Sequence, residues 1–225
     1  MTKKERAAQA VALLKARYPE GVCSLEYERP YELLISTRLS AQCTDARVNI
    51  VTKELYQKYP TLESFAHAEL EELEAVVKPC GFYHTKARDI ISMCADILEK
   101  HGGVVPDTIE ELTKLSGVGR KTANLVVGDI YGKPAIVTDT HCIRITGRLG
   151  LTSGTEEPVK VEDELRPLLD PAESNNFCHR LVLFGRDVCT ARSPKCGECP
   201  LREICKSADK PDSWKKKKTS LKGKK

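Results

Sequence analysis

The sequence lacks a long apolar run, a signal peptide and an internal repeat. No apolar stretch approaches the ~18–20 residues that a membrane span requires. The N-terminus is charged from Lys3 to Arg6 and has neither the apolar segment nor the cleavage site of a secretory signal. These absences exclude a membrane protein. They predict a soluble cytoplasmic protein whose 225 residues bury one good core or two small ones.

The chain also lacks a basic character outside its C-terminal end. Its net charge is +4, but residues 210–225 hold eight lysines and one aspartate, which leaves −3 for residues 1–209. Binding to a nucleic acid therefore has to rest on locally placed cations and main-chain donors, with the tail as an accessory. The tail is almost free of apolar residues, so we expect residues 208–225 to be a basic, disordered segment.

Apolar residues recur at helical spacing along nearly the whole chain, which predicts an all-α protein. Thr44 and Thr85 are typical N-cap residues before two of these helices. The second of them has its apolar face at Ile90, Cys94 and Ile97. Gly132-Lys133-Pro134 ends one helix and prevents an immediate continuation, so it is the best internal boundary.

The last four of ten cysteines form a compact pattern. Cys189, Cys196, Cys199 and Cys205 are spaced C-x6-C-x2-C-x5-C. Four thiolates this close can hold either tetrahedral zinc or a four-iron, four-sulfur cluster. The unequal gaps around a central C-x2-C favour the [4Fe-4S] cluster over the paired knuckles of a zinc ribbon, and disulfides are the competing interpretation.

A second pattern lies upstream, where residues 115–124 read LSGVGRKTAN and Asp139 follows Lys121 by eighteen residues. Gly117 and Gly119 permit backbone conformations that side chains would block, so the main chain between the two helices can approach a phosphate. The N–H groups at the start of the second helix point toward such an anion. With the cysteine pattern, this segment resembles the endonuclease III family of DNA glycosylase/abasic-site lyases. The resemblance runs from about residue 5 to residue 207.

The resemblance implies two helical domains. Residues 22–133 would form a six-helix domain with a helix-hairpin-helix motif, and residues 1–21 plus 134–207 a helical domain with a C-terminal [4Fe-4S] cluster loop. It also implies a monomer that acts in base excision repair on double-stranded DNA with damaged bases or abasic sites, in the cytoplasm at the nucleoid. Oxidised pyrimidines are the default substrates.

Two residues carry the chemistry that the resemblance implies. Lys121 would attack the sugar C1′ as a neutral amine, form a Schiff base and lead to β-elimination. Asp139 would stabilise the positive charge that develops on the sugar as the base leaves. In isolation, Asp139 before Thr140 also fits an ordinary helix N-cap.

Further residues are expected to contact DNA. Gln42 would fill the space left by the flipped nucleotide, and Phe82 stands where the family has a smaller apolar wedge. The other candidates lie in the glycine hairpin, just after Asp139, and between the first two cysteines of the pattern. They are Gly117, Val118, Gly119, Arg120, His141, Arg144, Arg192 and Lys195.

Some positions depart from the family pattern. Ser116 stands where proline is common, and Arg38 replaces a residue that is more often apolar, which leaves the lesion preference open. Two alternatives remain. One is an adenine-specific mismatch glycosylase of the same superfamily, which lacks a lysine at position 121. The other is a non-catalytic DNA-binding adaptor that holds zinc.

Overall fold

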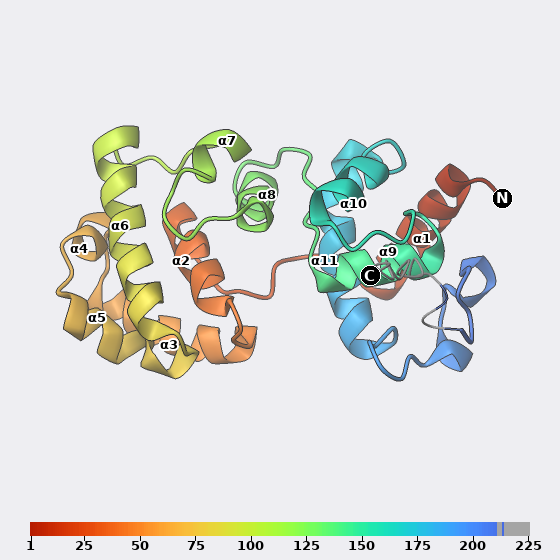
Figure 1. The fold of residues 1–225 in the computed structure, drawn as a ribbon, viewed down its shortest axis with the longest axis horizontal. Helices are drawn as coiled ribbons and strands as arrows, with labels where there is room; N and C mark the ends of the chain where they lie inside the picture. Colours follow the sequence, from red (N-terminus) through yellow and green to blue (C-terminus); the bar gives the residue numbers. More distant parts are fainter. Residues whose placement is uncertain (211–212, 214–225) are drawn as a thin grey trace, which may run out of the picture. The chain divides into compact units, whose positions relative to one another are not determined.

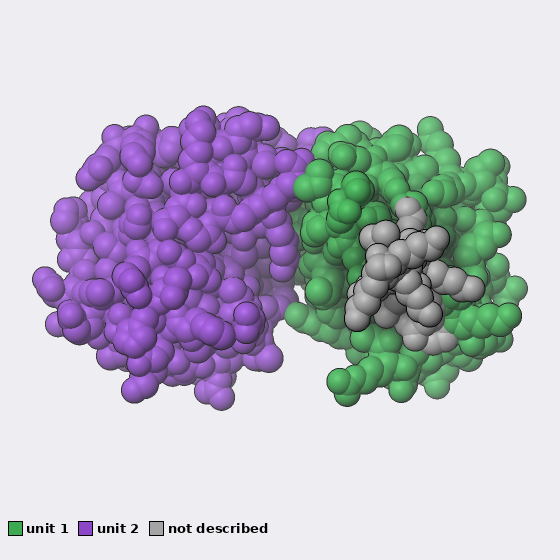
Figure 2. Space-filling view, in the orientation of Figure 1, with its two compact units in different colours: residues 1–22, 136–225 green, residues 23–135 purple. Residues whose placement is uncertain are grey.

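The structure is a computed structural model that describes residues 1–210 and 213. Within those residues it has eleven α-helices, three short 3-10 helices and no strand, so the all-α prediction is confirmed (Figure 1). The chain divides into two compact units, one of residues 1–22 with those from 136 onward, the other of residues 23–135 (Figure 2). No helix in the described part is long and apolar enough to cross a membrane.

The unit of residues 23–135 has seven α-helices against the six expected, and two of them are only five and four residues long. Its helices are α2 (Pro30–Ser40), α3 (Asp45–Lys58), α4 (Leu62–Ala66), α5 (Leu70–Val77), α6 (Tyr83–His101), α7 (Ile109–Leu112) and α8 (Arg120–Asp129), with the 3-10 helix η1 (Lys78–Cys80) before α6.

Helix α2 lies in the core of this unit and contacts α3, α6 and α8. Leu33, Leu34 and Leu39 are completely buried, each contributing about 1.5–3 kcal/mol of transfer free energy as an upper bound. Pro30 occupies its first turn, and the Glu32 carboxylate accepts hydrogen bonds from the main-chain N–H groups just before the helix. The helix ends at Ser40, two residues before Gln42.

Helix α6 packs against α4 and α5. Its inward face is fully buried at the predicted positions, Ile90, Cys94 and Ile97. The predicted N-cap at Thr85 is wrong, because α6 begins at Tyr83 and Phe82 is its N-cap, with a left-handed φ of 49°. Contacts made elsewhere in the unit therefore decide where this helix starts.

The other unit contains α1 (Lys3–Arg17), α9 (Thr140–Leu149), α10 (Pro158–Leu165) and α11 (Pro171–Asp187), with 3-10 helices η2 (Cys196–Glu198) and η3 (Arg202–Ile204). Helix α1 packs against α11 and η3, so the start of the chain joins its C-terminal part. Glu173 on α11 binds Lys15 and, at 2.9 Å, the buried Arg180, and these cations lower its pKa. Arg180 also donates to the Tyr18 carbonyl at 3.1 Å, which closes the end of α1.

The beginning of the predicted tail is held by side-chain contacts. Arg202 makes a two-point ion pair with Asp209, at 2.8 and 2.7 Å. The rest of the predicted disordered segment, residues 211–212 and 214–225, lies outside the described residues.

Candidate active site and metal centre

The turn between α7 and α8 requires glycine at one position. Gly117 has a φ of +73°, and a Cβ there would lie 2.7 Å from the Arg38 side chain and 2.9 Å from an Asp89 carboxylate oxygen. Gly119 differs, because its φ of −92° suits any residue and nothing lies within 4 Å of its Cβ position. The expectation that Gly119 needs the backbone freedom of glycine is therefore wrong. The space beside it is open.

An ion pair between α2 and α6 packs against the turn between α7 and α8. Arg38 on α2 donates to the Asp89 carboxylate on α6 at 2.6 and 2.7 Å, and both side chains are largely buried. The other oxygen of Asp89 accepts from the Ser116 hydroxyl at 3.1 Å. Two departures from the family pattern, Arg38 and Ser116, thus bind the same carboxylate and hold the turn against the core of its unit.

Lys121 lies in the first turn of α8, directly behind the glycine turn. The first N–H groups of a helix have no partner within it and carry the positive end of the helix dipole, so an anion is favoured there. Lys121 and Arg120 have exposed side chains, whereas the Val118 side chain is only 7% exposed. The Val118 main-chain N–H donates to the Leu115 carbonyl at 3.1 Å, so the predicted contact of Val118 with DNA stays a prediction.

Asp139 is the N-cap of α9, and its carboxylate accepts from the Cys142 N–H at 2.7 Å. The N-cap prediction is confirmed. The cap uses one carboxylate oxygen, and the side chain is half-buried, so the second oxygen is available for another role.

His141 and Arg144 are tied to their own unit. The Arg144 guanidinium lies 3.1 Å from Nδ1 of His141 and donates to the Cys189 carbonyl at 2.9 Å. Burial lowers the pKa of Arg144. The arginine therefore joins α9 to the cysteine loop, and its predicted contact with DNA stays a prediction.

Gln42 and Phe82 share an unusual backbone. Both are exposed and both have left-handed φ values, 57° and 49°. Phe82 is 65% exposed, which is uncommon for a large apolar side chain. An exposed phenylalanine and glutamine on constrained turns are suited to contact a partner, since neither contributes to the core.

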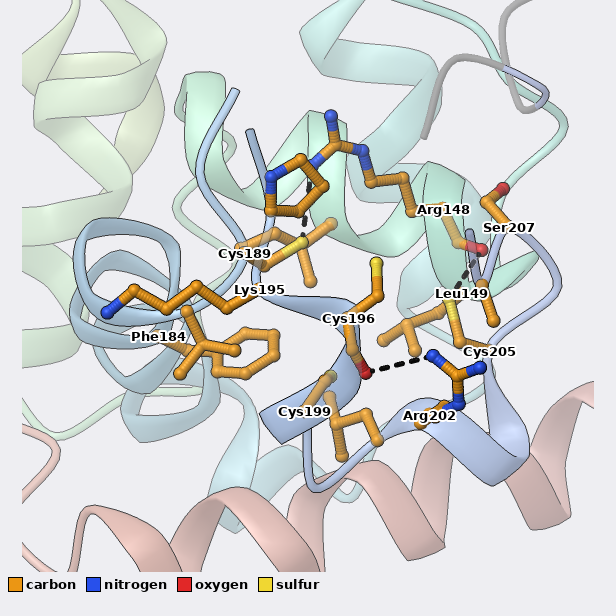
Figure 3. Close-up of a pocket in the computed structure, with 15 residues that line it drawn as sticks. Arg148, Leu149, Phe184, Cys189, Lys195, Cys196, Cys199, Arg202, Cys205 and Ser207 are labelled. Carbon is orange, nitrogen blue, oxygen red and sulfur yellow. Dashed lines mark hydrogen bonds between the residues drawn. The ribbon is translucent and has the colours of Figure 1, made fainter. Parts of the chain in front are cut away.

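The four C-terminal cysteines line one cavity (Figure 3). It is walled by apolar side chains such as Leu149, Phe184 and Leu201. In the described part of the chain, no three His, Cys, Asp or Glu side chains are arranged to hold a single metal ion. The four thiols instead lie around the cavity. Burial raises the pKa of Cys199 to about 11 and also raises the pKa of Cys205. Four thiol ligands around such a space fit a multi-iron cluster.

Arg148 is the residue beside this cavity that sequence patterns missed. It is buried on α9, and its guanidinium donates to the Cys189 sulfur at 3.3 Å and to the carbonyls of Thr190 and Ala191 at 2.7 and 2.9 Å. Its own carbonyl lies 3.4 Å from the sulfur of Cys205 (Figure 3). The signal that could have found it is a charged residue on the apolar stripe of α9, between Ile145 and Leu149.

The predicted cations of the cysteine loop are on its surface. Arg192 is exposed, and Lys195 is exposed with its Nζ 4.0 Å from Asp187. Of the predicted site residues, the unit of residues 23–135 holds Gln42, Phe82, Gly117, Val118, Gly119, Arg120 and Lys121. The other unit holds Asp139, His141, Arg144, Arg192, Lys195 and the four cysteines.

Comparison with known proteins gives the class. Residues 35–171, well over half of the chain, match the model of the HhH-GPD superfamily of base excision DNA repair proteins. Residues 189–205, from the first cysteine of the pattern to the last, match the iron–sulfur binding domain of endonuclease III. The chain is therefore a base excision DNA repair protein with an iron–sulfur domain.

The relatives narrow this class. Endonuclease III of Synechocystis sp. is 45% identical over 92% of this chain and 94% of its own, and that of Bacillus subtilis is 44% identical over 87% and 89%. A trapped endonuclease III–DNA covalent intermediate superposes with a TM-score of 0.88 at 42% identity, over 93% of this chain and 99% of that one. The chain belongs to the endonuclease III family.

Membership of this family confirms the main prediction from the sequence. The protein is a DNA glycosylase/abasic-site lyase of base excision repair, and its cofactor is a [4Fe-4S] cluster. The adaptor with zinc and the mismatch glycosylase are both less well supported than this function. A thermostable thymine-DNA glycosylase, 20% identical with a TM-score of 0.81, shares the fold alone.

Proposed function

We propose that this enzyme removes damaged, chiefly oxidised, pyrimidines from double-stranded DNA and then cleaves the abasic strand, with Lys121 as the nucleophile. The observation that carries the proposal is the position of Lys121, exposed in the first turn of α8 behind an open glycine turn. DNA phosphate bound at that turn brings the sugar close to an amine.

The reaction requires Lys121 as a neutral amine, since an ammonium group has no lone pair. Its nitrogen attacks C1′ and the bond from C1′ to the base breaks, so that the base leaves with the bonding electrons and takes up a proton. The sugar ring then opens to give a Schiff base. Loss of a proton from C2′ expels the phosphate at C3′, and water hydrolyses the Schiff base to free the lysine.

Asp139 acts through its charge in this proposal. As the base leaves, the sugar acquires oxocarbenium character, and a nearby carboxylate lowers the energy of that state more than it lowers that of the bound substrate. The N-cap hydrogen bond to Cys142 fixes the orientation of the carboxylate in advance.

Binding to DNA is assigned to side chains around these two groups. Main-chain N–H groups of Gly117, Gly119 and Arg120 hold a phosphate, while that of Val118 donates to the Leu115 carbonyl. Gln42 and Phe82 enter the base stack. When bound, the cluster supplies iron–thiolate bonds through Cys189, Cys196, Cys199 and Cys205 that fix the cysteine loop. Arg192 and Lys195 on this loop then contact phosphates, as do His141 and Arg144 on α9.

The organisation of the chain follows from these roles. Residues 22–133 would be the helix-hairpin-helix domain and residues 1–21 with 134–207 the cluster domain. One chain carries both proposed catalytic residues, so we infer a monomer. Because genomic DNA is the substrate, we infer action in the cytoplasm at the nucleoid, without a membrane partner.

Covalent trapping tests the proposal. Borohydride reduces the Schiff base to a stable link between protein and abasic DNA, so wild-type protein is trapped and Lys121→Ala is not. Lys114→Ala, which removes an exposed lysine paired with Glu111, is the matched control and is trapped normally. Undiminished trapping of Lys121→Ala would overturn the assignment. A panel of duplexes with single lesions, assayed at one salt concentration, tests the preference for oxidised pyrimidines.

A further inference from the structure

Lys86 on α6 is a completely buried lysine. Its ammonium donates to three main-chain carbonyls, those of Leu39 and Ala41 at 2.8 Å and that of Cys80 at 2.9 Å. Burial lowers its pKa, yet three acceptors match the three N–H donors of an ammonium group, whereas a neutral amine has only two. A buried charge is tolerated only when it is fully hydrogen-bonded, and this one is.

The three carbonyls come from two chain segments. Leu39 and Ala41 flank the last residue of α2, where helix carbonyls have no partner within the helix and carry partial negative charge. Cys80 ends η1, just before α6. One ammonium therefore joins the end of α2 to the end of η1. Lys86 is 47 residues from Leu39 and 45 residues from Ala41 in the sequence.

Each of these segments leads into a strained residue. Gln42 follows Ala41, and Phe82 follows Cys80 by two residues. Among the described residues, only Gln42, Phe82 and Asp209 are non-glycine residues with positive φ. A left-handed conformation is unfavourable for a residue with a side chain, so the surroundings have to hold it. The ammonium of Lys86 holds the carbonyls beside two of the three.

A thiol contact joins the same two segments again. The thiol of Cys80 neighbours that of Cys43, the residue after Gln42, and burial together with this neighbour raises the pKa of Cys80 to about 11. The two turns are therefore joined to each other through buried groups, and each carries one exposed side chain, Gln42 or Phe82.

We propose that Lys86 is a positioning residue for base extrusion: its ammonium fixes the Gln42 and Phe82 turns at one separation, so that both side chains enter the base stack together. The inference rests on the proposed roles of Gln42 and Phe82. Turning a nucleotide out of a duplex costs free energy because base stacking and pairing are lost. Side chains that are already in place add no further ordering cost at that step.

The test compares one abasic site in two settings, a duplex and a single strand. Only the duplex needs its stack opened, so Lys86→Met slows single-turnover trapping on duplex roughly 10- to 100-fold. On the single strand the rate stays within about threefold, since the chemistry at Lys121 does not depend on an opened stack. Lys100→Met on the same helix, which removes an exposed lysine paired with Asp96, leaves both rates unchanged.

Equal losses on both substrates would show that Lys86 only supports the fold, and wild-type rates on both would show that it has no role; either result overturns the proposal. Should Lys86→Met fail to fold, Lys86→Gln retains an amide donor in the buried site and is judged by the same ratio. Gln42→Ala and Phe82→Ala are measured alongside. If these two leave the duplex rate intact, the proposed roles of the turns fail. If they lower it and the Lys86 variants do not, the inference about Lys86 alone fails.

Discussion

The guanidinium of Arg148 lies 3.3 Å from the sulfur of Cys189 and also binds the next two carbonyls of the cysteine loop. Hydrogen bonds to a ligand sulfur and to the chain around it fix the ligand's orientation and withdraw charge from it. The buried Arg148 side chain of α9 therefore sets the path of the loop that carries Cys189, the first of the proposed cluster ligands. We therefore expect a cluster held at Cys189 to depend on this arginine as well as on the four cysteines.

We expect Arg148→Met to weaken retention of the cluster. The change removes a charged hydrogen-bond donor from the Cys189 sulfur and leaves the Thr190 and Ala191 carbonyls without that partner. Loss of such supporting hydrogen bonds typically lowers metal affinity about 10- to 100-fold. Iron per chain during incubation with a chelator is the measurement, and Arg88→Met, which removes an exposed arginine of α6, is the control. Iron loss at the wild-type rate would contradict this role.

Asp139→Asn should separate the two roles of this residue. Asparagine caps a helix about as well as aspartate, so the thermal stability stays within about 0.5 kcal/mol of wild type. The negative charge is lost, and base release falls at least about 100-fold, the order expected for one group that stabilises a charged transition state. Asp139→Ala loses the cap too and is destabilised by about 1 kcal/mol. Near-normal base release by Asp139→Asn would leave Asp139 as a helix cap only.

Gly117→Ala and Gly119→Ala should behave differently. At Gly117 the positive φ and the contacts with Arg38 and Asp89 leave no room, so alanine destabilises the protein by roughly 1–3 kcal/mol. At Gly119 the backbone and the space accept a methyl group, so stability changes by about 1 kcal/mol or less. The added methyl still hinders approach of a phosphate, and affinity falls for damaged and undamaged duplex alike. Unchanged affinity for Gly119→Ala would argue against a phosphate at this turn.

Local sequence patterns predicted the helices well where local forces decide. The side chains of Thr44 and Asp139 do cap α3 and α9, because an N-cap needs only its own helix's first N–H groups. Thr85 has the same chemistry but is not a cap. Helix α6 starts at Tyr83 because its N-cap, Phe82, is held in a left-handed conformation, which no local propensity favours.

Motifs single out Lys121 and the four cysteines in the sequence. The cysteines do line one cavity, and the catalytic role of Lys121 stays a prediction. No motif singles out Lys86 and Arg148, although each stands among apolar residues on the buried face of its helix. A charged side chain at such a position indicates that it has hydrogen-bond or ion-pair partners in the folded protein. Its partners, however, are main-chain carbonyls of segments up to 47 residues away, and only the folded chain brings them together.

The lysine-rich tail gives a test that depends on charge alone. Residues 214–225 hold seven lysines, and deleting them keeps the Arg202–Asp209 pair intact. If about three phosphates are neutralised by the tail, the slope of log affinity against log salt becomes shallower by roughly 2.7 on deletion. Affinity falls equally for damaged and undamaged duplex, because phosphate contacts carry no information about the base.

Serine in place of Lys215–Lys218 keeps the length of the tail and should reproduce most of the change. Single-turnover base release at saturating enzyme stays near wild type, since no lysine of the tail takes part in the chemistry. A salt slope that does not change on deletion would mean that the tail neutralises no phosphates and serves solubility instead.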